Sequence, residues 1–525
     1  MTSQRTRVDG ARTPTSRRGA VTIGVTAGLI GWLAFVELTS GILQGYYVPL
    51  ISDIVKHLGI HDADYNWFEA AQLLLSALVV PVLAKLGDMF GHKRILLIAT
   101  VLTALSTWAL AFSGSFVTFL IAFALQGFYV VWLPLEVALI FDRGRRSGTA
   151  ASQTRKAAGL LVIALEVGAI VGAVGAGLLF EALGGNVTLT LIVPAIAVTL
   201  VFFAILFGVP ESEPSPGRRL DAVGFSILTL GLLLITSGLT FLRINGVGTW
   251  WVWALIAAGL LTFIPFGRYE LKQDDPAIDL RVLRRPTMWP VQLTAGLIGI
   301  SLLGAQAPLS TFAGTDPVNG YGLGLSAGQR SILIGAYLIS MIAGAVLFPL
   351  VSSWASPRVA LIAASFLVAI GYLLFLPFHQ ETWQVFTNMA VAGIGSGALV
   401  GALPAAAAAA APRGQTGIAT ALTNTTKTIG GSFASAVFGV VLLAGAATVT
   451  ATAASLFGYM LVWTICGIGA LVAAVLLFFV PKLAFADAKP APALAPTVAP
   501  TAAPTPAPEA AEPSPDIEEG AQHAV

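Results

Sequence analysis

The sequence predicts an all-α protein that crosses a membrane many times, and two observations carry that prediction. Of the 525 residues, 56 % are hydrophobic and only 10 % are charged, whereas a soluble domain carries about 25 % charged residues. Runs of about twenty apolar residues recur between short polar loops, and each run is long enough to cross roughly 30 Å of hydrocarbon.

The apolar runs predict fourteen membrane spans. A proline-rich stretch at 210–216 separates the sixth span from the seventh. The spans cover residues 20–51, 67–86, 95–113, 115–140, 157–180, 187–209, 222–242, 250–268, 288–313, 329–352, 357–378, 384–409, 415–446 and 452–481.

The positions of the cations support this count. Cytoplasmic loops of membrane proteins carry an excess of Lys and Arg. With fourteen spans and both termini in the cytoplasm, all but four of the 28 Lys and Arg residues fall on the cytoplasmic side. Lys56, Arg243 and Arg330 fall outside, and Lys427 lies within a span. One span more or fewer would move the later loops, with their cations, to the opposite side of the membrane.

Composition limits the partners and the energy source. A net charge of +2 is too small to indicate nucleic-acid binding. The single cysteine, Cys466, allows neither a disulfide within the chain nor a cysteine metal site. No phosphate-binding loop occurs, so we expect no cofactor and a transmembrane gradient as the energy source. Residues 1–19, which are basic, and 482–525, which are rich in Ala and Pro and end acidic, are expected to be disordered.

The loop between the second and third spans carries a recognisable motif. Gly87 and Gly91 permit tight backbone turns, Asp88 can cap the next helix, and Lys93 and Arg94 hold the loop at the inner face. The loop resembles the Gly-x-x-x-Asp-x-x-Gly-x-Lys/Arg motif of the major facilitator superfamily, in which it acts in gating. A generic charged turn is the alternative.

Three further stretches resemble the fourteen-span drug:proton antiporter branch of that superfamily. They are residues 416–432, 219–225 and 270–285. The resemblance implies two six-helix bundles at 20–209 and 288–481, joined by a linker with two extra helices at 210–287. It also implies alternating access around a cavity lined mainly by the first, fourth, ninth and twelfth spans.

The chain departs from that branch in three spans. Phe123 occupies the position of an arginine that couples protons to substrate in the family, although Gln126 and Gly127 of the same motif are present. Ala173 replaces the proline of the fifth span, whose small residues still permit close helix packing. Glu37 replaces an aspartate of the first span. These departures indicate a divergent branch.

Four charged residues lie deep in the spans: Glu37, Glu136, Glu166 and Lys427. Each costs at least roughly 2.5–3.5 kcal/mol at the bilayer centre. Glu37, in a span that lines the cavity, can carry a proton or hold a cationic substrate, and the alternative is a hydrogen bond to neighbouring hydroxyls. Glu166 is a second candidate for proton coupling, with a structural ion pair as its alternative.

The other two charges are interpreted mainly as partners. Glu136 lies six residues before Asp142, about 9 Å along a helix, so it can reach the cytoplasmic surface or pair with Arg143 or Arg145. Lys427 needs an anion, and Glu166 or Glu37 can supply it.

Other side chains are candidates for contacts with a substrate. Glu37, Gln126, Trp132, Gln306 and Asn424 lie in spans expected near the cavity, although each alone is more often a packing residue. Glu69, at the start of the second span, is expected at the membrane surface.

The leading hypothesis is a proton-coupled secondary transporter that exports hydrophobic, drug-like molecules from a bacterium across its inner membrane. We expect a multi-pass monomer that contacts lipid, protons and a small-molecule substrate but no nucleic acid. The rivals are a transporter of an endogenous metabolite or lipid, with or without protons, and a non-transporting sensor or scaffold. The insertion cost of the buried charges argues against a scaffold.

Overall fold

All elements of the structure, which is a computed structural model, are helical. It describes residues 27–146, 150–212, 220–273, 276, 278–411, 416–444 and 452–479, and no strand occurs among them. The two terminal segments predicted to be disordered, 1–19 and 482–525, lie outside the described residues.

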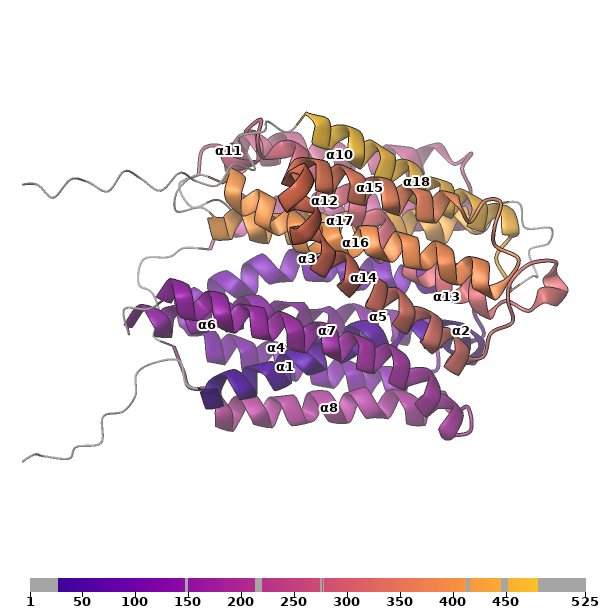
Figure 1. Cartoon of the computed structure of the whole chain (residues 1–525), viewed down its shortest axis with the longest axis horizontal. Helices are drawn as coiled ribbons and strands as arrows, with labels where there is room; N and C mark the ends of the chain where they lie inside the picture. Colours follow the sequence, from indigo (N-terminus) through magenta and orange to yellow (C-terminus); the bar gives the residue numbers. More distant parts are fainter. Residues whose placement is uncertain are drawn as a thin grey trace, which may run out of the picture. The chain divides into compact units, whose positions relative to one another are not determined.

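The helices follow the predicted spans in order (Figure 1). The N-terminal group contains α1 (Ala27–Tyr46), α2 (Ile51–Leu58), α3 (Tyr65–Phe90), α4 (His92–Ala111), α5 (Phe116–Gln126), α6 (Trp132–Arg146), α7 (Ala150–Ala182) and α8 (Val187–Gly208). Two helices, α9 (Ala222–Asn245) and α10 (Trp250–Glu270), come next. The C-terminal group contains α11 (Leu280–Leu283), α12 (Trp289–Gly299), α13 (Gln306–Gly314), α14 (Ala327–Ala355), α15 (Pro357–Leu373), α16 (Thr382–Ala410), α17 (Thr416–Val441) and α18 (Leu456–Phe478).

Among the described residues, twelve helical segments are long and apolar enough to cross a membrane. The predicted spans at 357–378 and 415–446 are not among the twelve. α15 has 17 residues, and α17 is rich in threonine and contains Lys427. The count of fourteen spans and the cytoplasmic location of both termini therefore remain predictions.

Two of the predicted spans are interrupted helices. A 3-10 segment, η3 (Gly127–Val131), separates α5 from α6, and a π-helical segment, η4 (Ile300–Gly304), separates α12 from α13. Ser76 of α3 donates a hydrogen bond to the Gly127 carbonyl at 3.0 Å. Such irregular turns often mark functional sites, and both lie in spans that the sequence predicts to line the cavity.

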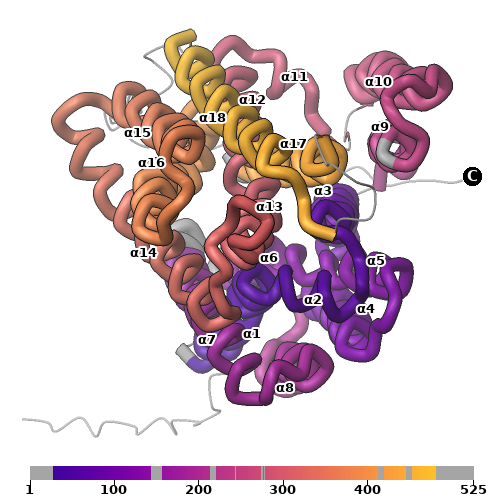
Figure 2. Tube along the Cα trace, turned by 90° about the vertical axis from the view of Figure 1, so that its right-hand side faces the viewer, coloured from indigo at the N-terminus to yellow at the C-terminus, as the bar shows by residue number. Residues whose placement is uncertain are grey.

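Each group has its own hydrophobic core. One core consists almost entirely of residues from α1 to α8, and the other almost entirely of residues after α10. α9 and α10 pack against each other beside α3 and α17 (Figure 2), which they reach through a small apolar cluster that includes Leu74, Leu232 and Phe266. The domain boundaries predicted from the sequence are not tested by these cores.

The two groups meet at one end of the bundle. α3 packs along α17, and α7 packs along α14. Ser432 donates a hydrogen bond to the Ala70 carbonyl at 2.8 Å, and the Gly177 N–H donates to Ser331 at 3.0 Å. Within the described residues, every hydrogen bond between the groups lies toward this end, which we call the closed end.

α1 and α7 approach so closely that glycine is needed at their contact. A Cβ atom on Gly168 would lie 2.8 Å from the Leu38 carbonyl carbon and 3.1 Å from the Ile42 nitrogen. Gly41 and Gly45 of α1 face the α7 backbone in the same way. The prediction that the small residues of the fifth span form a packing surface is confirmed.

Replacing Gly168 by alanine should therefore destabilise the protein although alanine favours helices. The added methyl group forces two backbones apart, which costs about 1–3 kcal/mol. We expect a fall of several degrees in the unfolding temperature of the detergent-solubilised protein. Gly175 of the same helix has open space around its Cβ position, so Gly175→Ala is the matched control. Equal unfolding temperatures for the two variants would contradict the close contact.

Candidate functional site

Two carboxyl groups share the interior of the N-terminal group. Glu37 lies in the middle of α1 and Glu136 lies one turn into α6, and both side chains are 0 % exposed. Their four carboxyl oxygens have no hydrogen-bond partner among the described residues. The two groups are close enough to interact electrostatically. We call Glu37 and Glu136 the carboxyl pair.

The position of Glu136 corrects the prediction for it. Its side chain lies on the buried face of α6 with Trp132 and Leu139, which are also 0 % exposed. These residues recur at a spacing of three to four, so they share one side of the helix. The prediction that Glu136 can reach the membrane surface is therefore wrong. The ionisable group that interacts with it electrostatically is Glu37.

A hydrogen-bonded network lies on the same side of the N-terminal group. Gln126 donates to the Tyr47 hydroxyl at 2.6 Å and to Thr107 at 3.1 Å, and it accepts from Gln72 at 3.2 Å. Tyr47 and Glu37 both interact electrostatically with Tyr129 of η3. The Gln126 amide is thus already engaged within the protein, and η3 links this network to the carboxyl pair.

The position of the missing family arginine is filled by aromatic rings. Phe123 is buried, and its ring centroid lies 5.5 Å from Tyr47, 5.8 Å from Tyr65 and 5.8 Å from Phe119. Packing of this kind leaves no room for a guanidinium group. The N-terminal group therefore buries two acids without the cation that the family places in this span.

Glu166 of α7 and Lys427 of α17 interact electrostatically across the two groups. Both side chains are half-buried, and no direct ion pair joins them in the part of the chain that the structure describes. Of the two acids that the sequence offered to Lys427, the structure brings Glu166 to it. Because the two residues belong to different groups, their separation depends on how the groups are arranged.

Glu69 is a buried acid whose importance the sequence did not show. It is only 8 % exposed, and its carboxyl accepts a hydrogen bond from Ser435 of α17 at 3.4 Å. The expected level at the membrane surface stays a prediction, and burial against α17 is what the sequence did not show. The signal available in the sequence was its place one turn after Tyr65, at the start of a helix whose first six residues are all buried.

A buried ion pair locks the closed end. Arg330, at the start of α14, is 2 % exposed and pairs with Asp53 of α2. Its Nε also donates to the Pro49 carbonyl at 2.9 Å. Nearby, the Gly328 N–H donates to Glu181 of α7 at 2.9 Å. Losing either partner of such a pair leaves an uncompensated charge in a buried place, so these contacts hold the two groups together here.

The connection between α13 and α14 strengthens this end. Tyr321 donates a hydrogen bond to the Ala454 carbonyl. Burial, together with the charge of Asp62, raises the pKa of Tyr321 to about 12. The hydroxyl therefore keeps its proton, and with it the hydrogen bond, across the physiological pH range.

The loop between α3 and α4 is fixed at the opposite end. The imidazole of His92 lies 3.3 Å from Asp88 and 3.6 Å from Asp142 of α6, and the His92 N–H donates to Ser212 at 2.8 Å. Asp88 therefore contacts His92 and does not cap α4, whose N-cap is Gly91. His92, which the sequence motif does not include, organises the loop.

The rest of the loop binds the segment after α8. The Lys93 N–H donates to Glu211 at 3.0 Å, and Arg94 pairs with the same carboxylate at 3.7 Å. Gly91 has φ +102°, and a Cβ there would lie 2.7 Å from Glu211. A Cβ atom on Gly87 would lie 2.6 Å from the Cδ2 atom of Leu135. The positive φ of Gly91 strains any other residue at this position, whereas the contact at Gly87 is with the flexible end of a leucine side chain.

The remaining candidates lie apart from the carboxyl pair. Gln306 donates to the Leu302 carbonyl of its own helical run at 3.1 Å, and Asn424 is exposed on α17. No hydrogen bond joins either of them to Glu37 among the described residues. The role of Glu37, Gln126, Trp132, Gln306 and Asn424 as substrate contacts stays a prediction.

Comparisons with known proteins agree with this architecture. A family profile described as the Major Facilitator Superfamily matches residues 33–435, which is well over half of the chain. The chain therefore belongs to the Major Facilitator Superfamily.

Its relatives include bacterial exporters. A probable actinorhodin transporter of Streptomyces coelicolor is 26 % identical over 444 residues, which cover 81 % of this chain and 72 % of that protein. The cephamycin export protein CmcT of Amycolatopsis lactamdurans is 28 % identical over 414 residues, covering 76 % and 82 %. The crystal structure of the POT family transporter PepTSo matches with a TM-score of 0.61 at 13 % identity, covering 86 % of this chain and 98 % of that one.

These findings define the class of protein. The chain is a multi-pass transporter of small molecules, and its bacterial relatives and twelve candidate spans are consistent with a bacterial inner membrane.

Neutralising Arg330 should loosen the closed end. Ser52 is 4 % exposed and donates to the Ser310 carbonyl, so its accessibility reports whether the closed end has opened. The labelling variant carries Ser52→Cys in a Cys466→Ala background. We expect a water-soluble maleimide to label this cysteine severalfold faster when Arg330→Gln is added. Arg358→Gln, which removes a cation bound to the end of α18, is the control. Equal labelling rates in both would contradict a lock at Arg330.

Proposed function

We propose that the protein exports hydrophobic, drug-like small molecules in exchange for protons, by alternating access. The single observation that carries this proposal is the carboxyl pair, two fully buried acids that have no hydrogen-bond partner among the described residues. A transporter driven by protons needs a site that gains and loses a proton during the cycle, and buried carboxyls inside membrane spans are the usual form of such a site.

The pair has the physical properties of a shared proton site. Two ionised carboxylates near each other in a medium of low dielectric repel strongly, and such dyads hold one proton between them. One proton bound by Glu37 and Glu136 removes that repulsion. The pair then loses the proton only when a change of conformation brings it water or another acceptor.

The arrangement of the two groups supports alternating access. The closed end, with Arg330 and Asp53, is the end that the cation distribution assigns to the outside of the cell. This conformation would therefore bind substrate from the cytoplasm. Opening to the outside requires Arg330 to leave Asp53, and it requires α3 to leave α17, which uncovers Glu69 and its bond to Ser435.

The proposed direction is export because the proton gradient of a bacterium points inward. Protons would enter from the outside while the outer end is open, and would leave to the cytoplasm while it is closed. Glu166 would assist by exchanging its interaction with Lys427 as the two groups move. The relatives named as transporters or export proteins of actinorhodin and cephamycin support this direction and a small organic substrate.

The test is proton coupling in reconstituted vesicles. Vesicles with an imposed pH gradient receive a panel of lipophilic compounds, including the cationic dye ethidium, and a fluorescent pH probe reports dissipation. We expect compounds that dissipate the gradient with the wild type to do so at least tenfold more slowly with Glu37→Gln or Glu136→Gln. Glu381→Gln, which removes an exposed carboxyl in a loop, should behave as the wild type.

Counterflow of labelled substrate separates loss of coupling from loss of folding. Exchange of substrate for substrate needs no net proton movement, so both variants should retain it. Dissipation by Glu37→Gln at the wild-type rate would remove the pair from coupling. Substrate counterflow without dissipation by the wild type would favour an uncoupled transporter.

A further inference from the structure

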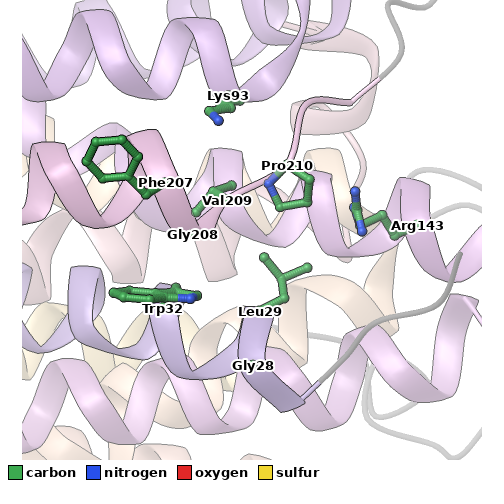
Figure 3. Close-up of a pocket in the computed structure, with 9 residues that line it drawn as sticks. All are labelled: Gly28, Leu29, Trp32, Lys93, Arg143, Phe207, Gly208, Val209 and Pro210. Atoms are coloured by element: carbon green, nitrogen blue, oxygen red, sulfur yellow. The ribbon is translucent and has the colours of Figure 1, made fainter. Parts of the chain in front are cut away.

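A cavity of about 430 Å³ lies within the N-terminal group, and none of the helices that contact the C-terminal group along their length, α3 and α7, lines it (Figure 3). It is formed between the start of α1, the start of α4, the end of α6 and the end of α8. Its lining includes Gly28, Trp32, Lys93, Arg143, Phe207 and Pro210. All of its lining residues belong to the N-terminal group, so the cavity is separate from the surface between the two groups.

The charged lining of this cavity is positive. Lys93 and Arg143 contribute side chains to it, and no carboxylate is among its lining residues. Glu211 pairs with Arg94, and Asp142 lies against His92. The Lys93 ammonium donates to the Leu206 carbonyl at 2.8 Å, so it is held at the cavity by a neutral group.

The apolar lining opens toward the outside of the bundle. Trp32 is 46 % exposed and Phe207 is 79 % exposed, and Figure 3 shows both rings beside the cavity. A Cβ on Gly208 would overlap the Trp32 indole, with the ring Cδ1 atom 2.6 Å away. Glycine at this position therefore lets the indole lie flat against the end of α8.

We propose that this cavity binds the headgroup of an anionic phospholipid from the cytoplasmic leaflet. Two cations beside exposed aromatic rings match a phosphodiester attached to acyl chains. Basic pockets between spans on the cytoplasmic side are suited to such headgroups, and aromatic rings favour the membrane interface. Lys93 follows the loop that the cation distribution assigns to the cytoplasmic face, which is the level of the headgroups. The proposal does not depend on proton coupling.

Binding can be measured directly on the full-length protein. Delipidated protein in detergent is titrated with phosphatidylglycerol or phosphatidylcholine and followed by native mass spectrometry. We expect phosphatidylglycerol to bind at least tenfold more tightly than phosphatidylcholine. Each basic residue near a membrane surface contributes about a fivefold preference for anionic lipid, so Lys93→Gln with Arg143→Gln should weaken binding about 25-fold. Arg284→Gln with Arg285→Gln removes the same charge from an exposed loop and should have no effect.

A second pair of variants keeps the proposal falsifiable if the double variant does not fold. Gly28, at the cavity, has open space around its Cβ position, and an acid in the first turn of a helix is favourable. Gly28→Asp should weaken phosphatidylglycerol binding about fivefold, and Gly28→Asn should not. Inorganic phosphate should fail to displace the lipid. Equal affinity for the two lipids, equal binding by Gly28→Asp and Gly28→Asn, or full displacement by phosphate would overturn the proposal.

Discussion

The cost of burying charge away from water governs this structure. Glu37 and Glu136 are both fully buried inside the N-terminal group, and Phe123 with its aromatic neighbours occupies the position of the arginine in the motif that the sequence resembles. Because the carboxyl oxygens of the pair have no hydrogen-bond partner among the described residues, a proton is the simplest group that can remove their repulsion. The departure from the family motif therefore increases the importance of the two acids.

The same cost explains how the two groups are held. Arg330 and Asp53 form a charged contact that is stable only while it stays buried and hydrogen-bonded. Glu69 lies on the same interface with Ser435. A structure that opens here must supply water to the Arg330–Asp53 ion pair and to the ionisable carboxyl of Glu69 at once, so opening and changes in protonation are physically linked. Glu166 and Lys427 add a weaker link between the same two groups.

Much of the fold follows from the sequence because lipid imposes simple rules. Backbone groups in hydrocarbon must be satisfied within helices, so apolar runs predict where the long helices lie, although not the interruptions at η3 and η4 or the separate helix α2. The glycines of α7 likewise predict close packing with another helix, although not with α1. The number of spans stays open, because α15 is short and α17 is polar.

The site is less predictable, because periodicity does not fix which buried groups meet. Its distance from Asp142 lets Glu136 reach the cytoplasmic surface or pair with Arg143 or Arg145, yet it lies on the buried face of α6, where Glu37 interacts with it electrostatically. The loop motif does not indicate His92, because it specifies glycines and charged residues. His92 acts through contacts with α6 and with the segment after α8. The sequence cannot decide which acid interacts with Lys427, because the arrangement of the two groups determines that it is Glu166.

Infrared difference spectroscopy on the reconstituted protein tests the central claim most directly. A protonated carboxyl in an apolar site gives a carbonyl stretching band that is absent from ionised carboxylates. If the carboxyl pair holds one proton, the wild type at neutral pH shows such a band, and replacing both Glu37 and Glu136 by glutamine removes it. A band that persists unchanged in the double variant, or a wild type without one, would contradict the account.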